Sequence, residues 1–407
     1  MASPAKKHSH IPELDGVRGI AVLLVMIFHF GGGYAETQHN FLASAIGLGW
    51  SGVDLFFVLS GFLITTILLG TRKDPHFFRN FYLRRALRIL PLYYLYLIAF
   101  AFIFLPVAHH YHKFLSDQIG QLSLYWVHLS NWGVQANPMS GSPVAQMWSL
   151  AIEEQFYFLW PLLIFLLPDE ILLLVCFALA ATSLGLRLTP SMQAIQLTHT
   201  EFLYRLTPFR IEPLCYGAMI ALLTRRIQGV NFRGWAGWIS LASGAGLLCF
   251  LRLHGKTLER TSLNMAGFGY TGIGLCAAGL VLLALRYEGS NAVYAHVLRS
   301  RVLRTLGKYS YAMYIFHVPI SQFGQKIIYH FIKNPLLGLA FNFALGVGFT
   351  FLMAKLSWKY FESPILSLKD RIAGYRKAVD FSPEVEKHTE THLAGPESPE
   401  TSRSATA

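Results

Sequence analysis

The chain has 407 residues, of which 53% are hydrophobic and only 14% are charged, and its mean hydropathy is +0.41. This composition excludes an ordinary soluble domain and predicts an all-α polytopic membrane protein. The formal net charge of +12 does not indicate a nucleic-acid-binding protein, because the lysines and arginines cluster at the ends of apolar segments, where they set the orientation of membrane helices. Cys176, Cys215, Cys249 and Cys276 each lie alone in an apolar segment, so we expect neither disulfides nor a metal site.

The first apolar segment, residues 14–33, is long enough to cross a bilayer and yet carries ionisable side chains. Asp15, Arg18 and His29 follow helical spacing and lie on one face. Arg18 and His29 are eleven residues apart in the sequence, a rise of about 16 Å, which places them near opposite leaflets. This face must contact protein or water, because a charge in hydrocarbon costs at least about 2.5 kcal/mol. By itself, the helix fits a catalytic face and a packed polar face equally well.

The remaining apolar segments predict a bundle of ten transmembrane helices. The further spans are expected at residues 50–69, 89–107, 148–167, 171–186, 202–223, 235–251, 265–285, 309–328 and 336–358. Residues 117–143 are only weakly apolar and predict a short span or, near 118–135, a re-entrant segment. If this segment does not cross, every strong basic cluster lies on the cytoplasmic side, and so do both termini. The outer loops, which then include Arg187 and Arg260, carry fewer positive charges.

These spans define the expected domain organisation. Residues 1–10 form a cytoplasmic N-terminus and residues 11–372 a single transmembrane domain. From residue 379 the chain is rich in Pro, Ser, Thr and Glu without an apolar period, so we expect residues 373–407 to form a disordered cytoplasmic tail. No soluble catalytic domain follows, and any chemistry is therefore assigned to the bundle.

One charged cluster is predicted at the cytoplasmic face. It combines Arg18 with Arg84, Arg85 and Arg88 of the RRALR run, where the arginines stand three and four residues apart. Neighbouring guanidinium groups on one helix face suit a polyphosphate, because each can donate two hydrogen bonds. The alternative is that these arginines only set the topology and bind membrane lipid head groups.

A second cluster is predicted near the outer face, where His29 ends its span and Asp54 begins the next. A carboxylate that holds one imidazole nitrogen fixes the tautomer and makes the other nitrogen a better base, so Asp54 is the candidate that orients His29. Trp148, Glu153 and Glu154 are expected at the same depth, and only one of the two adjacent glutamates can face the site.

For the remaining polar residues, the sequence predicts a depth in the membrane but no specific catalytic role. Arg205, Arg210 and Glu212 fall at the outer level, where the alternative is an interface ion pair such as Arg210 with Glu212. His317 is expected nearer the inner half, as a packed histidine or part of an acceptor site. The sequence contains no G-x-S-x-G elbow, zinc-type histidine pair or phosphate-binding glycine loop.

Six blocks, in order along residues 11–364, resemble the membrane-bound acyltransferase family 3, the O-antigen acetylase type of enzyme. The blocks are LDGVRGIAVLLVMIFHF, GVDLFFVLSGFLIT, RRALRILPLYY, MWSLAIEEQFYFLWP, LGKYSYAMYIFHVPI and YFESPI. The resemblance implies an enzyme of the bacterial inner membrane that moves an acyl group, commonly acetyl from acetyl-CoA, onto a hydroxyl of an extracytoplasmic glycan or glycoside. It matches His29 to the essential histidine, Arg18 to its partner arginine, and Arg85 and Arg88 to the R-x-x-R pattern linked to the donor.

The same resemblance leaves the second half of the reaction open. The family's frequent C-terminal SGNH hydrolase-like domain is absent from this sequence, so the chain either completes transfer alone or passes the acyl group to a periplasmic or extracellular partner enzyme. We expect His29, oriented by Asp54, to act as general base or to carry the acyl group transiently.

Two other classes of protein remain as alternatives. A membrane transporter of a glycan or lipid-linked intermediate would use the same charges without acyl chemistry, although no internal repeat supports it. A donor-binding protein that only passes acyl groups to a partner would keep the arginines and tolerate loss of Asp54.

Overall fold

The computed structural model describes residues 11–38, 40–104, 116–136, 142–227 and 230–372, and every regular element within these ranges is a helix. The predicted N-terminal segment 1–10 and tail 373–407 lie outside the described residues. The α-helices are α1 (Pro12–Thr37), α2 (Phe41–Gly47), α3 (Gly52–Thr71), α4 (Phe77–Ala99), α6 (Ser116–Trp126), α7 (Met147–Leu166), α8 (Asp169–Leu188), α9 (Pro190–Thr198), α10 (Phe202–Arg205), α11 (Thr207–Arg210), α12 (Glu212–Arg226), α13 (Val230–Leu253), α14 (Tyr270–Arg286), α15 (Val293–Leu298), α16 (Arg301–Phe331), α17 (Pro335–Ser357) and α18 (Ser363–Ile372).

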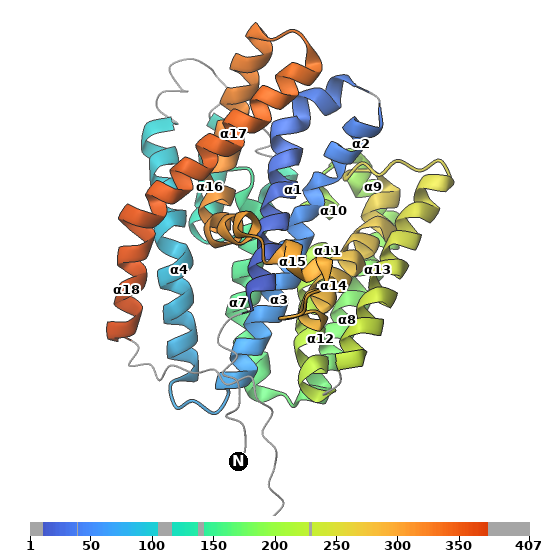
Figure 1. The fold of residues 1–407 in the computed structure, drawn as a ribbon, viewed down its shortest axis with the longest axis vertical. Helices are drawn as coiled ribbons and strands as arrows, with labels where there is room; N and C mark the ends of the chain where they lie inside the picture. Colours follow the sequence, from blue (N-terminus) through green and yellow to red (C-terminus); the bar gives the residue numbers. More distant parts are fainter. Residues whose placement is uncertain (1–10, 39, 105–115, 137–141, 228–229, 373–407) are drawn as a thin grey trace, which may run out of the picture.

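Eight helical segments in the described part of the chain are long and apolar enough to cross a membrane. They contain α1, α3, α4, α7, α8, α13, α14 and α17. This confirms the prediction of an all-helical, multi-pass membrane protein. The helices surround α1, which runs through the centre of Figure 1 with α4, α17 and α18 on one side and α8, α12, α13 and α14 on the other.

The expected span 202–223 is not one helix. The chain there forms α10, α11 and the 15-residue α12, and 15 residues rise only about 22 Å. Pro208 and Pro213 are each the second residue of a new helix, because proline lacks the N–H of a continuing helix and is well tolerated in the first turn of the next one. Broken backbone at this depth is stable only where protein surrounds it. The break turns three charged side chains toward the bundle interior, where they are buried: Arg205, Arg210 and Glu212.

The expected span 309–328 is the central part of a longer helix. α16 has 31 residues and begins at Arg301, eight residues before the predicted start. Its early turns carry Arg301, Arg304 and Lys308, and it is not among the eight candidate spans. Hydropathy therefore detected only its middle.

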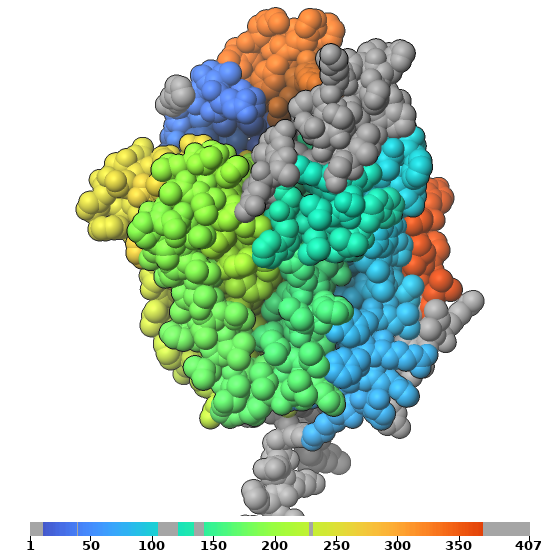
Figure 2. Space-filling model, turned by 180° about the vertical axis from the view of Figure 1, so that it is seen from behind, coloured from blue at the N-terminus to red at the C-terminus, as the bar shows by residue number. Residues whose placement is uncertain are grey.

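Residues 117–143, predicted as a short span or re-entrant segment, fall partly within the short helix α6. Its 11 residues rise about 16 Å, roughly half of a hydrocarbon core. Tyr93 and Tyr94 of α4 donate hydrogen bonds to the carbonyl oxygens of Tyr125 and Trp126, at 2.7 and 3.1 Å. Figure 2 shows α6 residues (teal) at one end of the face that α4 (blue) and the α7–α8 pair (green) form.

Glycine allows two helix pairs to approach closely. A Cβ on Gly307 of α16 would overlap the Asp15 carbonyl oxygen of α1, and a Cβ on Gly217 of α12 would overlap the Val58 carbonyl oxygen of α3. Small residues at such crossings permit backbone contact in membrane bundles. The first contact sets the register of α1 against α16, and the second sets α3 against α12.

The α3–α12 crossing predicts a stability difference between two matched variants. Gly217→Ala should destabilise the protein by about 1–3 kcal/mol because the new methyl group meets backbone that must move. Gly246→Ala in α13 should be neutral or slightly stabilising, because nothing lies within 4 Å of its Cβ and alanine favours helix. Thermal unfolding in detergent measures both, and equal melting temperatures would contradict the packing described here.

Candidate functional site

The His29 side chain is held in one tautomer by its own helix. Its Nδ1 lies 3.0 Å from the Val25 carbonyl oxygen, one turn earlier in α1. A carbonyl oxygen only accepts, so Nδ1 carries the proton and donates it, and the neutral ring keeps its lone pair at Nε2. His29 is therefore arranged to accept a proton at Nε2.

His29 lines a cavity of about 540 Å³ at the end of the bundle where α1 terminates. Aromatic and polar side chains from α1, α7, α10 and α16 form its walls together with the loop before residue 265. Its lining includes Phe28, Trp50, Gln146, Trp148, Glu201, Tyr204, Arg205, Glu259, Arg260, Tyr314, Gln322 and Gln325. Aromatic faces with both donors and acceptors are the surroundings that a hydroxylated ligand requires.

His317 lies beside His29 and not in the inner half. The ring centroids are 4.5 Å apart and the ring planes meet at 79°. The predicted depth was wrong because α16 starts at Arg301: His317 is 16 residues beyond that start and His29 is 17 beyond Pro12, the start of α1. The contact between the two rings places both histidines at one level.

Asp54 pairs with Arg210 and not with His29. The Arg210 guanidinium lies 2.9 Å from the Asp54 carboxylate, and both side chains are 0% exposed. Arg210 also stacks on Tyr204 and Tyr270, with its guanidinium carbon 4.9 and 4.5 Å from the ring centroids. The predicted orienting contact from Asp54 to His29 is therefore replaced by the Val25 carbonyl.

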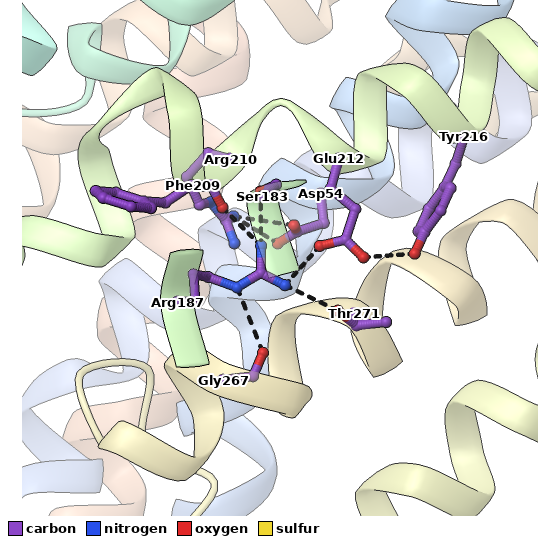
Figure 3. Close-up of polar contacts among 9 residues, drawn as sticks. All are labelled: Asp54, Ser183, Arg187, Phe209, Arg210, Glu212, Tyr216, Gly267 and Thr271. Carbon is purple, nitrogen blue, oxygen red and sulfur yellow. Dashed lines mark hydrogen bonds and ion pairs between the residues drawn. The ribbon is translucent and has the colours of Figure 1, made fainter. Parts of the chain in front are cut away.

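A second buried ion pair supports the first (Figure 3). Arg187, at the end of α8, lies 2.6 Å from Glu212, whereas the sequence analysis placed it in an outer loop. It also donates to Ser183, Thr271 and the Phe209 carbonyl oxygen. Arg187 thus anchors the backbone next to Arg210. The suggested pair of Arg210 with Glu212 is wrong, because Arg210 pairs with Asp54 and Glu212 pairs with Arg187.

The loop residue Arg260 was also missed as a site residue. It donates to Glu201 at 2.5 Å and lies over the rings of Phe28 and Tyr204, at 5.5 and 5.0 Å. Glu201 also forms an ion pair with Arg205. A single arginine in a polar loop carries no sequence signal, and only the fold places it opposite His29.

The arginine cluster predicted at the other end of α1 is partly assembled. Arg18 forms an ion pair with Asp15 at 3.3 Å and lies within electrostatic range of Arg85 and Arg88. The Arg85 guanidinium carbon is 5.2 Å from the centroid of the Tyr157 ring. Arg84 precedes them on α4, is half-buried like Arg85, and takes part in other interactions.

Glu153 and Glu154 belong to this cluster and not to the level of His29. Glu153 accepts hydrogen bonds from Ser60 at 2.8 Å and Tyr157 at 3.3 Å, and both glutamates lie within electrostatic range of Arg85. They lie five and six residues beyond Trp148 in α7, which is about 8–9 Å deeper along the helix. Trp148 itself stays at the cavity, with its ring centroid 4.8 Å from that of Tyr204.

No group of three or more metal-ligating side chains occurs within the described ranges. The site combines an imidazole acceptor and a polar cavity at one end of α1 with an arginine cluster at the other, and two buried ion pairs lie behind the cavity.

The sequence matches the family described as "Acyltransferase domain" over residues 11–355. It is 28% identical over 376 residues to the peptidoglycan O-acetyltransferase OatA of Listeria monocytogenes, a match that covers 88% of this chain and 56% of that protein. It is 30% identical over 392 residues to the putative peptidoglycan O-acetyltransferase YrhL of Bacillus subtilis, which covers 92% of this chain and 57% of that protein. The chain thus spans little more than half the length of these relatives. No solved structure matches.

The buried Asp54–Arg210 pair predicts a steep loss of stability when one partner is removed. Arg210→Met should cost about 3–5 kcal/mol, because Asp54 is left as an uncompensated buried charge, whereas the double variant Asp54→Leu/Arg210→Met should recover most of the loss. As a control, Arg226→Met breaks the exposed pair with Glu170 and should cost less than about 1 kcal/mol. Thermal unfolding in detergent measures all three, and a double variant no more stable than Arg210→Met would contradict the assignment.

Proposed function

Because this chain belongs to the acyltransferase 3 family, we propose that it is an integral-membrane O-acyltransferase. It takes an acyl group from acyl-CoA, with acetyl-CoA as the expected donor, and transfers it to a hydroxyl of an extracytoplasmic carbohydrate. The relatives named for peptidoglycan support a cell-wall glycan as the acceptor. Their bacterial sources support the bacterial inner membrane as the location.

The observation that carries this proposal is the state of His29. Its Nδ1 proton is committed to the Val25 carbonyl oxygen, so that Nε2 is left as an acceptor in a side chain that lines the cavity. A general base needs this arrangement. The cavity is built for an acceptor with hydroxyl groups, since it offers aromatic walls next to glutamine, glutamate and arginine side chains.

The arginine cluster at the opposite end of α1 supports acyl-CoA as the donor. Arg18, Arg85 and Arg88 concentrate positive charge within electrostatic range of one another, which suits the phosphates of coenzyme A. Glu153 and Tyr157 hold this cluster in place, because Tyr157 bonds to Glu153 and lies under Arg85. Glu154 contributes a second negative charge near Arg85. The two glutamates thus offset the repulsion between the neighbouring arginines.

In the reaction, the acceptor hydroxyl gives its proton to His29 Nε2 while its oxygen attacks the thioester carbonyl carbon. The carbon–sulfur bond breaks, and the CoA thiolate takes the proton from the imidazolium. If His29 carries the acyl group instead, its Nε2 attacks the thioester carbonyl carbon first and the CoA thiolate leaves. The acceptor oxygen then attacks the acyl carbon, the bond to Nε2 breaks to restore the neutral imidazole, and the hydroxyl proton passes to the thiolate. Asp54 and Arg210 take no part in the proton transfer; they position Tyr204 and with it the cavity wall.

The first test is His29→Ala. Loss of a general base should lower CoA release from radiolabelled acetyl-CoA by about 10²- to 10⁴-fold without unfolding the protein, since the side chain is only half-buried. His330→Ala is the matched control, because His330 is an exposed histidine at the end of α16. Full activity of His29→Ala would remove the proposal. Label retained on the wild-type protein would select the acyl-carrier route over direct transfer.

A second test separates donor binding from chemistry. Arg85→Ala should raise the KM for acetyl-CoA by about tenfold, the effect of losing roughly 1.4 kcal/mol of charge-assisted contact. Arg79→Ala removes a charge from an exposed position two turns earlier on α4 and should leave KM unchanged. If both variants change KM equally, the arginines act only through topology or surface charge.

A further inference from the structure

We propose that the acceptor is a glycan with a free carboxylate, such as a sugar acid, and that Arg260 binds this carboxylate while an acceptor hydroxyl faces His29. This inference rests on the proposed function, in which the cavity holds the acceptor and His29 is the base. It is carried by the charge balance of the cavity and by the contacts that hold the Arg260 guanidinium.

The charges inside the cavity do not balance. Among the described residues that line it, one buried residue carries a carboxylate, Glu201, and it is paired with two arginines, Arg205 and Arg260. The other two carboxylates of the lining belong to the exposed residues Glu36 and Glu259, where solvent and salt screen their charge. A buried charge is costly unless it is paired. A carboxylate on the ligand would therefore match two arginines with two carboxylates.

Arg260 is the arginine of this pair that a ligand can reach. Its side chain is 27% exposed, whereas that of Arg205 is 7% exposed. One of its terminal nitrogens donates to Glu201 at 2.5 Å. A guanidinium has five N–H donors in a planar fork, so the same group can bind a second carboxylate.

The Arg260 guanidinium is held in one orientation by its neighbours. Its carbon lies 5.5 Å from the centroid of the Phe28 ring and 5.0 Å from that of Tyr204. The Tyr270 hydroxyl donates to the Arg260 carbonyl oxygen at 2.5 Å and so fixes the loop that carries it. A guanidinium that is already oriented can form two parallel bonds to a carboxylate, and this geometry distinguishes a carboxylate from a neutral group.

One acceptor molecule can contact both Arg260 and His29. Phe28 contacts both side chains, because its ring centroid is 5.0 Å from that of His29 and 5.5 Å from the Arg260 guanidinium carbon. The base and the cation are thus separated by no more than the sum of these two distances. A sugar acid, alone or with a neighbouring sugar, can span this separation with its carboxylate on Arg260 and a hydroxyl at His29.

Two acceptors that differ in a single group test the assignment. Methyl glucuronide carries a carboxylate where methyl glucuronamide carries an uncharged amide of the same shape, and both have the same hydroxyl groups. The purified protein in detergent receives radiolabelled acetyl-CoA with either compound, and the labelled glycoside is counted. We expect kcat/KM to be about tenfold higher for the glucuronide, which corresponds to about 1.4 kcal/mol of charge-assisted hydrogen bonding.

A variant of Arg260 tests whether this residue causes the preference. Arg260→Gln should raise the KM for the glucuronide about tenfold and leave both kcat values and the KM for the amide unchanged. Arg252→Gln is the matched control, because Arg252 is an exposed arginine in the last turn of α13, and it should keep the full preference. Melting temperatures are compared, and the wild-type comparison stands by itself should Arg260→Gln unfold.

Three results would overturn the assignment: equal kcat/KM for the two glycosides, a preference that survives Arg260→Gln, or a fall in kcat for both glycosides alike. Where neither glycoside accepts label, equilibrium dialysis with the radiolabelled glycosides decides. Tighter binding of the glucuronide supports the assignment, and equal binding overturns it. A wild type that releases no CoA, or a His29→Ala variant with full activity, refutes the proposed function instead.

Discussion

The ion pair between Asp54 and Arg210 is the constraint on which the rest of the bundle depends. Both side chains are 0% exposed, and Asp54 lies in one of the segments that are long and apolar enough to cross a membrane. Neither charge is tolerable alone, since removing one partner of such a pair costs several kcal/mol. The pair thus requires α3 and the α10–α12 segment to meet at one register, which the glycine contacts of Gly61 and Gly217 allow. Arg187 extends this constraint to α8 and α14 through Glu212 and Thr271.

Prolines act with these charges by freeing backbone groups that side chains then satisfy. Pro208 and Pro213 break the span after α10, and Arg187 takes the Phe209 carbonyl oxygen that lies between them. Pro319 frees the Ile315 carbonyl oxygen, and Gln146 takes it. In both places a side chain from another part of the bundle bonds to the carbonyl oxygen that the proline leaves free. Such bonds allow irregular backbone to be buried inside a membrane bundle. The second of these bonds lies at the cavity beside His29, because Gln146 lines its wall.

Sequence patterns predicted the membrane class and most helices, because apolar length is a local property. They also placed Arg18 and His29 on one stripe, since spacing within one helix follows from its geometry. The pairing of Asp54 with Arg210, 156 residues away, is set by helix packing and leaves no local signal. His317 was given the wrong depth because hydropathy locates the apolar middle of a helix and not its ends, and a shift of a few residues changes depth by several ångströms. The bounds of α7 were predicted to within one residue, but Glu153 lies five residues beyond Trp148 and is therefore about 8 Å deeper along the helix. The roles of the site residues remain predictions.

The tautomer of His29 depends on α1 alone, because its Nδ1 bonds to a carbonyl oxygen of the same helix. Arg18 lies on the same helix, so one element carries both the proposed base and one member of the arginine cluster at a fixed separation. The walls of the cavity come from other elements: Trp148 from α7, Tyr204 from α10 and Arg260 from a loop. The geometry of the base and the shape of the acceptor site are thus encoded in different parts of the chain. Under the proposed function, substitutions in the loop that holds Arg260 change which acceptor fits without altering the proton transfer, whereas a change in the register of α1 alters both ends of the site together.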